Sequence, residues 1–307
     1  MKERIIYEIK GLYRDNFRVR GYEFGKGKKS VCIVGTMRGN EVQQLYCCSQ
    51  LIRKFKQLED EGRIAPGHKI LIIPSCNPSS LNIQKRFWPI DNTDINRMFP
   101  GYNLGETTQR IADGIFKEIM DYEYGIQFTS FYMPGEFMPH IRMMDEGYST
   151  VEKAMLFEMP YVVVRDVRPY DTTTLNYNWQ VWNTQAFSFY TTTTTTIDRR
   201  SAGQAVLSIM KFLDSLGILK YPHVPKAEPS VVFRDRDLIT VQTAKSGIFE
   251  TLVRVGQEVD EGTPLANIIH PYTGEIMETL FAPTASTVFF MHTDPLTYAN
   301  TAVFKLI

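Results

Sequence analysis

The sequence predicts an α/β protein with a mixed, largely parallel sheet flanked by helices, followed by a smaller C-terminal all-β domain. Two observations predict it. An apolar run at 29–36, helical apolar spacing over 41–60 and a second apolar run at 68–78 form a strand–helix–strand unit, which implies parallel pairing through a right-handed crossover. Beyond residue 230, short strands punctuated by glycines replace this pattern, as in a small all-β module.

The alternation of strands and helices continues towards the C-terminal half of the chain. The further predicted elements are helices at 107–121 and 199–216 and strands at 160–165 and 186–196. The six threonines at 191–196 are expected to form strand or strand-edge loop, because threonine is β-branched. Three prolines within 221–229 predict a linker. The expected domains are therefore 1–222 and 230–307.

Charge and hydropathy exclude several classes of partner. The 307 residues include 34 basic and 34 acidic side chains, so there is no general basic field for nucleic acid or anionic lipid. The first residues are charged, and no apolar run reaches the ~20 residues that cross a bilayer. We therefore expect a cytoplasmic protein that binds neither nucleic acid nor membrane. The four cysteines form no CxxC pair and are expected to be buried, reduced thiols.

Three motifs at fixed spacing carry a family resemblance. MRGNE at 37–41 follows the first apolar strand, and residues 77–101 contain an NP turn, an arginine and the pattern DxNRxFPG. A third motif, MPHIR, lies at 138–142. Together they resemble the succinylglutamate desuccinylase/aspartoacylase family, and the SGIF, VGQEVDEGTPL and FAP segments resemble that family's C-terminal β-domain.

The resemblance implies a zinc carboxypeptidase-like fold and hydrolysis of N-acyl amino acids. In the family, the histidine and glutamate of an HGNE motif and the histidine of a DLH motif bind zinc, which activates a water molecule. A glutamate near the end of a late strand acts as general base. Arginine and asparagine side chains of the NP…DxNR segment hold the substrate carboxylate.

Carried onto this chain, the resemblance places other residues at the catalytic positions. Arg38 replaces the first histidine, and Glu41 is the only surviving metal ligand. Ile126 and Phe128 stand at the aspartate and histidine of DLH, and Tyr190 stands at the expected general-base position. Neither a guanidinium nor a phenyl ring offers an atom that binds zinc. We therefore expect Arg38 to pair with Glu41 in the metal's place, and zinc, the family's cofactor, not to be bound here in the family's manner.

The positions on the substrate side do match. They are Asn77, Arg86, Asp94, Asn96 and Arg97, with His140 in the MPHIR motif. Two interpretations stay open for each kind of residue. Arg86 and Arg97 either hold a ligand carboxylate or bridge the protein's own groups, with Asp94 as a partner. His140 is either a structural, hydrogen-bonded histidine or a ligand, and Tyr190 is either packed or a hydrogen-bond donor.

Three functions follow as hypotheses. The first is a degenerate family member, a pseudoenzyme, that binds a small carboxylate-bearing ligand such as an acylated amino acid. The second is an active amidohydrolase or carboxypeptidase-like enzyme with a non-standard metal site, which would need a new ligand such as His140. The third is an assembly protein whose β-domain mediates self-association into a homo-oligomer. The retained arginines and asparagines favour the first.

Overall fold

A computed structural model describes residues 1–11, 15–145, 147–222 and 228–307. These residues divide into two compact units. The first unit consists of Met1–Ser130, Pro139–Thr191 and Thr195–Phe233, and the second of Phe131–Met138, Thr192–Thr194 and Arg234–Ile307. The predicted linker at 221–229 falls mostly on 223–227, outside the described residues, so it stays a prediction.

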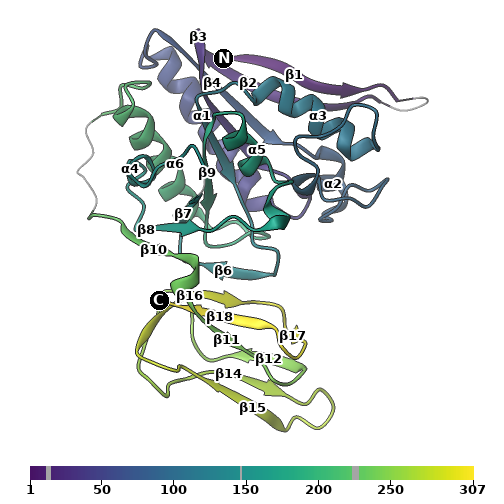
Figure 1. The fold of residues 1–307 in the computed structure, drawn as a ribbon, viewed down its shortest axis with the longest axis vertical. Coiled ribbons are helices and arrows are strands. Elements are labelled where there is room, and N and C mark those ends of the chain that lie inside the picture. Colours follow the sequence, from purple (N-terminus) through teal and green to yellow (C-terminus); the bar gives the residue numbers. More distant parts are fainter. Residues whose placement is uncertain (12–14, 146, 223–227) are drawn as a thin grey trace. The chain divides into compact units, whose positions relative to one another are not determined.

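The first unit is built on a nine-stranded mixed sheet with the order β1-β2-β4-β3-β5-β9-β7-β8-β10 (Figure 1). Its strands are β1 (Lys2–Ile9), β2 (Phe17–Gly25), β3 (Gly27–Thr36), β4 (Gly67–Ser75), β5 (Tyr124–Phe128), β7 (His140–Met144), β8 (Tyr161–Arg165), β9 (Gln185–Tyr190) and β10 (Val231–Arg234). Its helices are α1 (Val42–Asp60), α2 (Pro78–Ile83), α3 (Thr107–Ile119), α4 (Val151–Met155), α5 (Leu175–Val181) and α6 (Arg199–Ser215), with 3-10 turns η1 (Ile95–Arg97) and η2 (Pro169–Asp171).

The centre of this sheet is parallel, as the strand–helix–strand pattern predicts. β3 pairs in parallel with β4 and β5, and β5 pairs in parallel with β9. β7 runs antiparallel to β9, and β1 and β2 add an antiparallel edge. The predicted mixed, largely parallel sheet flanked by helices is therefore confirmed, although the two N-terminal strands lay outside the prediction.

Both faces of the sheet are buried. In β3, Val31 and Ile33 pack in the core that α1 and α6 cover, whereas Cys32 and Val34 pack in the core that α3 and α5 cover. Successive side chains point to opposite faces of a strand, so a continuous apolar run is what a doubly covered strand requires. The loops at the carboxyl ends of these strands therefore extend from a sheet that is packed on both faces.

The predicted strand at 186–196 is too long. β9 ends at Tyr190, and the threonines at 191–196 form a loop. The backbone N–H of Phe137 donates to the carbonyl of Thr192 at 3.0 Å, and Thr192–Thr194 belongs to the second unit. Because this part of the tract bonds to another segment, it leaves the sheet ladder despite its β-branched side chains.

The second unit is built of antiparallel β-sheets. Its strands are β6 (Gly135–Phe137), β11 (Ile239–Gln242), β12 (Gly247–Thr251), β13 (Glu258–Val259), β14 (Pro264–Ile269), β15 (Ile276–Phe281), β16 (Ser286–His292), β17 (Leu296–Thr297) and β18 (Ala302–Leu306), with a 3-10 turn η3 (Asp235–Asp237). Most follow residue 234. β6 comes from much earlier in the chain and pairs with β16, where a Cβ at Gly135 would lie 2.1 Å from the Phe290 ring. Only glycine fits that approach.

The cysteines are buried and free, as predicted. Burial raises the pKa of all four thiols, to about 12 for Cys47, so none is a ready nucleophile. Among the helices of the described ranges, none combines the length and the apolar character needed to cross a membrane.

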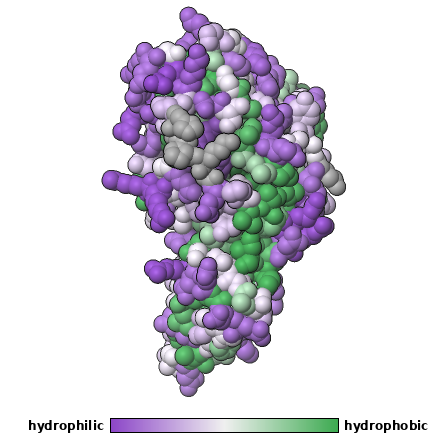
Figure 2. Space-filling model, turned by 90° about the vertical axis from the view of Figure 1, so that its left-hand side faces the viewer, coloured by the Kyte–Doolittle hydropathy of each residue, from purple (hydrophilic) through white to green (hydrophobic). Residues whose placement is uncertain are grey.

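Apolar side chains also reach the surface. Figure 2 shows hydrophobic residues gathered on part of the face that it draws, among hydrophilic neighbours. Exposed apolar residues include Met155 on α4 and both Val231 and Val232 in β10, the last strand in the sheet order. An exposed edge strand of this kind can pair with another chain. Self-association nevertheless stays a prediction.

Candidate functional site

The motifs predicted from sequence meet at the carboxyl ends of the central strands of the first unit's sheet. Arg38 follows β3 by two residues, Asn77 follows β4 by two, and Ser130 follows β5 by two. Tyr190 ends β9, and His140 lies opposite it because β7 runs antiparallel. These positions mark the carboxyl ends of the parallel strands, where open α/β sheets bind their ligands.

The loop after β3 is shaped around the carboxylate of Glu41. Its Oε2 atom accepts hydrogen bonds from the backbone N–H groups of Met37, at 2.7 Å, and Arg38, at 3.0 Å. A Cβ at Gly39 would lie 2.0 Å from the carbonyl oxygen of Ser80, so the glycine of the RGN motif allows the loop to approach α2 closely. The loop is thereby fixed with Glu41 turned inward and 1% exposed.

Arg38 binds its neighbours through all three guanidinium nitrogens. Nη1 lies 3.2 Å from Glu41 Oε1 and 3.0 Å from Ser130 Oγ. Nε and Nη2 lie 3.0 and 2.9 Å from Asp94 Oδ2. Ser130 in turn donates to Glu41 Oε1 at 2.5 Å. We call Arg38, Glu41, Asp94 and Ser130 the guanidinium cluster; it contains the Arg38–Glu41 pair that the sequence predicts.

The charges of the cluster stabilise one another. Burial opposes the charge on Arg38, but the adjacent Glu41 and Asp94 raise the pKa of its guanidinium. Burial would likewise raise the pKa of Asp94, yet the charge and hydrogen bonds of Arg38 hold it below its usual range. Charges buried in this way are tolerated only when paired and hydrogen-bonded, so each member depends on the others.

A three-ligand zinc ion does not fit these residues. The Oε1 atom of Glu41 already accepts hydrogen bonds from Arg38 and Ser130. The guanidinium of Arg38 has no lone pair for a metal, and it keeps its charge at any ordinary pH. Over the parts of the chain that the structure describes, no group of three or more His, Cys, Asp or Glu side chains is placed to hold a metal ion.

Arg86 lies at the outer side of the guanidinium cluster. Its Nη2 atom lies 3.4 Å from Asp94 Oδ2, the oxygen that Arg38 also contacts, and its side chain is 28% exposed. Burial lowers the pKa of Arg86, and the neighbouring charge of Arg38 lowers it further. The negative charge of an incoming anion would favour the charged form of Arg86 against both effects, since two cations share one carboxylate oxygen there.

Asn77 offers a second donor at this edge. Its Oδ1 atom accepts from the N–H of Ser80 at 3.1 Å and begins α2. Its Nδ2 group is buried and has no hydrogen-bond partner among the described residues. A buried amide donor of this kind is costly to leave unpaired, so it is a natural contact for an acceptor on a ligand.

Asn96 and Arg97 have bonds within the protein. Asn96 Oδ1 accepts from the backbone N–H of Leu175 at 3.1 Å and so fixes the start of α5. Arg97 Nη1 donates to the carbonyl of Asn96 at 3.1 Å. The contacts of Asn96 brace the segment within the protein. Its backbone N–H also donates to Asp94 Oδ1 at 3.1 Å, which ties it to the guanidinium cluster.

His140 and Tyr190 form a buried aromatic stack. Their ring centroids lie 4.6 Å apart at an interplanar angle of 8°, and the guanidinium carbon of Arg142 lies 4.7 Å from the centroid of the tyrosine ring. The two rings therefore pack against each other, and the interpretations of His140 as a ligand and of Tyr190 as a hydrogen-bond donor stay predictions. Arg142 is buried like His140, with which it shares a face of β7.

Phe128 lies in the core. It is fully buried, and its ring centroid is 5.4 Å from that of Phe189. Sequence reasoning stopped at Phe128 and missed Ser130, the residue that contacts Arg38 and Glu41. The alternation of side chains along an extended strand could have pointed to Ser130. Residues two apart lie on the same face of the sheet, and residue 130 lies further than residue 128 towards the carboxyl end of the strand.

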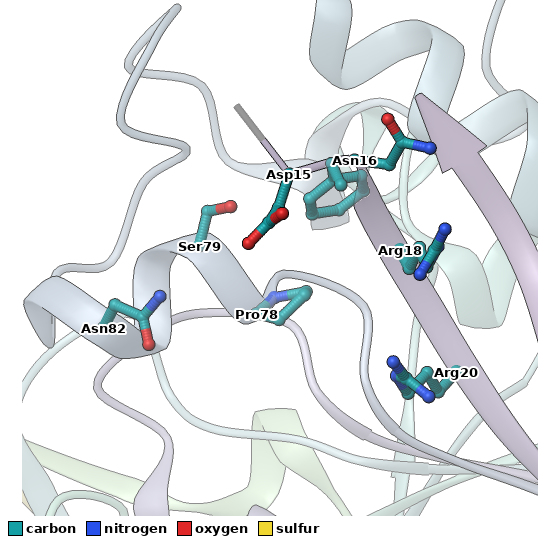
Figure 3. Close-up of a pocket in the computed structure, with 8 residues that line it drawn as sticks. Asp15, Asn16, Arg18, Arg20, Pro78, Ser79 and Asn82 are labelled. Carbon is teal, nitrogen blue, oxygen red and sulfur yellow. The ribbon is translucent and has the colours of Figure 1, made fainter. Parts of the chain in front are cut away.

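A separate surface pocket of about 630 Å³ lies between β2 and α2. It is lined by Asp15, Asn16, Phe17, Arg18, Arg20, Pro78, Ser79 and Asn82. Figure 3 shows Arg18 and Arg20 side by side on the strand, across from Ser79 and Asn82 on the helix. Arg18 is paired with Glu8 at 2.7 Å, and none of the lining residues belongs to the guanidinium cluster. The pocket is therefore distinct from the strand-edge site.

Asp94 makes the guanidinium cluster sensitive to acid. Because its folded-state pKa lies below the ordinary 3.8, the aspartate contributes its full stability above pH 3.8, and this is lost as the pH falls through the lower folded value. Asp94→Asn removes the effect, so the stability gap between wild type and variant should shrink from neutral pH to about pH 3. Urea unfolding of both proteins at several pH values measures this gap. A gap that stays constant would contradict the shifted pKa.

Comparisons with known proteins agree with the fold. The model of the succinylglutamate desuccinylase/aspartoacylase catalytic domain matches residues 27–127. A search of curated protein sequences finds no match. Among solved structures, a succinylglutamate desuccinylase from a Silicibacter species has a TM-score of 0.79 at 19% identity, covering 94% of this chain and 88% of its own.

Two further structures share the fold over most of their length. The ectoine utilization protein EutE (DoeB) from Ruegeria pomeroyi, in a product-bound structure, has a TM-score of 0.80 at 20% identity, covering 95% of this chain and 89% of its own. A putative family protein from Shewanella amazonensis has a TM-score of 0.79 at 16% identity, covering 100% and 98%. The chain thus resembles the succinylglutamate desuccinylase/aspartoacylase catalytic domain over residues 27–127 and shares the fold of these solved structures.

Proposed function

We propose that the protein binds a small carboxylate-bearing ligand, such as an acylated amino acid, beside Arg86 and Asn77 at the carboxyl ends of the sheet strands. It binds this ligand without zinc and does not hydrolyse it. The observation that carries this proposal is the guanidinium of Arg38, which is bonded to Glu41 where the family uses two metal ligands. A metal-activated water has no evident place there.

The ligand chemistry follows from the donors at the edge. Arg86 presents a partly exposed guanidinium, and Asn77 presents a buried amide donor that lacks a partner among the described residues. A guanidinium recognises a carboxylate through charge-assisted hydrogen bonds, and the amide nitrogen can donate to a second oxygen. A carboxylate with an adjacent acyl carbonyl carries both acceptors.

The alternative of an active amidohydrolase requires Glu41 to serve as metal ligand or base. Its carboxylate accepts two backbone N–H bonds, one serine bond and one arginine bond. These partners take up both of its oxygens. The contacts therefore favour binding over hydrolysis, and self-association remains a separate hypothesis without a specific contact to support it.

Thermal stabilisation by acylated amino acids and dicarboxylates tests the proposal. We expect wild type to be stabilised in a concentration-dependent way, because a ligand that binds only the folded state shifts the unfolding equilibrium. Arg86→Met should lose at least about tenfold in affinity, as expected for a charge-assisted bond worth at least ~1.5 kcal/mol. Arg110→Met, an exposed arginine on α3, is the matched control and should bind as wild type does.

Two results would count against the proposal. An Arg86→Met variant that binds as tightly as wild type would remove the assigned carboxylate site. Absence of stabilisation by any N-acyl amino acid or dicarboxylate would leave the strand edge without its proposed ligand. Release of free amine from an N-acyl amino acid by wild-type protein would instead support the hydrolase alternative.

A further inference from the structure

A groove of about 440 Å³ lies between α1 and α6 of the first unit, and we call it the helix groove. One of its walls is a stripe of α1 made up of Tyr46, Gln50, Arg53, Lys54 and Gln57. The other wall is a stripe of α6 made up of Arg199, Ala202, Gly203 and Val206. Residues three or four apart share a face of a helix, so each set presents one continuous surface. A volume of this size suits a small organic ligand.

The helix groove is cationic. Among the described residues that line it, three are basic and none is acidic. Arg53 Nη2 donates to Gln50 Oε1 at 2.8 Å, within the same helix. Lys54 Nζ donates to Gln57 Oε1 at 3.2 Å in the same way. Because these amide partners are neutral, they leave the positive charges of the groove available to an anion.

The two walls of the groove are fixed to each other at the start of both helices. Gln43 is fully buried, and its Nε2 atom donates to the carbonyl of Asp198 at 2.9 Å, while its Oε1 atom accepts from the N–H of Asp198 at 3.0 Å. The Asp198 carboxylate caps α6, accepting from the N–H groups of Arg200 and Ser201 at 3.0 and 3.2 Å. Both helices also cover the same core. The groove is therefore formed before any ligand enters.

Gly203 keeps the α6 wall of the groove open. A Cβ at this position would meet no other part of the described chain within 4 Å, its own helix backbone and chain neighbours aside. Packing therefore does not require a glycine here. Helix stability does not favour one either, because glycine inside a helix is less stable than alanine. What glycine provides at this position is space in the groove.

We infer that the helix groove binds a small organic phosphate, with the phosphate among the three cations and the organic part against Tyr46 and Val206. A phosphate monoester carries a charge of about −1.5 to −2 at neutral pH and three acceptor oxygens, which suit arginine and lysine donors. Tyr46 and Val206 are partly buried and pack on the core beneath the groove. They offer the ligand an apolar surface beside the charged one.

Thermal melts with three small organic phosphates test the inference, with the ionic strength held constant by chloride. The probes are adenosine monophosphate, ribose 5-phosphate and phenyl phosphate. We expect at least one of them to stabilise wild type in a concentration-dependent way. Adenosine should give no shift, because it lacks the phosphate. Arg53→Met/Arg199→Met should lose at least about tenfold in affinity for that probe, since charge-assisted contacts are removed. Lys56→Met, an exposed lysine on α1 outside the groove lining, is the matched control and should bind as wild type does.

Gly203→Leu gives a second readout that leaves all three cations in place. Its side chain enters open space, and leucine favours a helix over glycine, so the variant without ligand should melt no lower than wild type. The same side chain fills the groove, so the probe should no longer stabilise the protein. If leucine prevents folding, Gly203→Ala adds a single methyl group to the groove and should bind the probe more weakly than wild type.

Four results would overturn the inference. They are no stabilisation of wild type by any of the three probes, equal stabilisation by inorganic phosphate, wild-type affinity in folded Arg53→Met/Arg199→Met, and wild-type affinity in folded Gly203→Leu. Equal stabilisation by inorganic phosphate would mean that the organic part makes no contact. Tighter binding of a single-stranded DNA oligonucleotide, lost in Arg53→Met/Arg199→Met, would assign the groove to a nucleic acid strand and would also overturn it.

This site goes beyond the proposed function and is tested separately from it. The helix groove shares no residue with the guanidinium cluster and includes neither Arg86 nor Asn77. Arg86→Met should therefore bind the organic phosphate as wild type does, and Arg53→Met/Arg199→Met should bind an N-acyl amino acid as wild type does. Failure of the carboxylate screen leaves the organic phosphate result unchanged, and the converse also holds.

Discussion

Replacing Arg38 by methionine is expected to lower the free energy of unfolding by about 3–5 kcal/mol. The change leaves two carboxylates, on Glu41 and Asp94, buried without the cation that now contacts both. Urea unfolding of wild type and variant at neutral pH measures the loss. A loss below about 1 kcal/mol would mean that the cluster is no tighter than a surface ion pair.

Neutralising the whole cluster provides the control for this effect. Arg38→Met combined with Glu41→Gln and Asp94→Asn removes both unpaired charges, so the triple variant should be less destabilised than the sum of its single variants. Arg110→Met, on the exposed face of α3, should change stability by no more than about 0.5 kcal/mol. Simple additivity of the three changes would contradict a coupled cluster.

Phe128→Ala is expected to cost a similar amount, about 3–5 kcal/mol, for a different reason. The ring is fully buried against Phe189, so truncation leaves a cavity that the surrounding strands and helices fill only in part. Phe128→Leu should cost clearly less, because most of the buried volume is kept. Both are measured by urea unfolding.

The same pair of variants separates packing from a role in the site. If Phe128 serves the core alone, a folded Phe128→Leu protein binds the carboxylate ligand as wild type does. Weaker ligand binding by folded Phe128→Leu, without a matching loss of stability, would place the ring at the site instead. The position would then belong to the ligand edge rather than to the α1–α6 core.

The parts of the fold predicted from sequence are those that local patterns specify. The runs that became β3 and β4 are buried on both faces and read as continuous apolar segments, and α1 shows helical apolar spacing between them. β1 and β2 mix charged with apolar residues, and their charges pair across the strands, as in Arg4 with Glu23. Such an antiparallel edge gave a weaker signal than the central strands.

The candidate site was predictable only in part, because some of the residues that contact one another in it lie far apart in the sequence. Arg38 and Glu41 are three residues apart, so their pairing could be inferred from the motif itself. Ser130 is 92 residues from Arg38 and Asp94 is 56 residues away, and only the folded sheet shows that one guanidinium contacts both. The resemblance placed Phe128 at a ligand position, whereas the contacts in the structure involve Ser130.

The threonine tract shows the same limit. β-branched residues favour strand locally, yet the carbonyl of Thr192 accepts its hydrogen bond from Phe137, far away in the sequence. Tertiary pairing therefore decides where β9 ends, and residue preference alone does not.

The second unit consists of three separate segments of the chain, which limits how it could be exchanged between proteins. This unit takes Phe131–Met138 directly after Ser130, and Thr192–Thr194 starting two residues after the end of β9, before its main segment begins at Arg234. Phe131 and Phe137 pack against Phe290, so the early segment is part of that unit's own interior. The β-module is therefore not a detachable tail, and a chimera with a relative would have to transplant three pieces of chain, two of which begin within two residues of Ser130 and Tyr190.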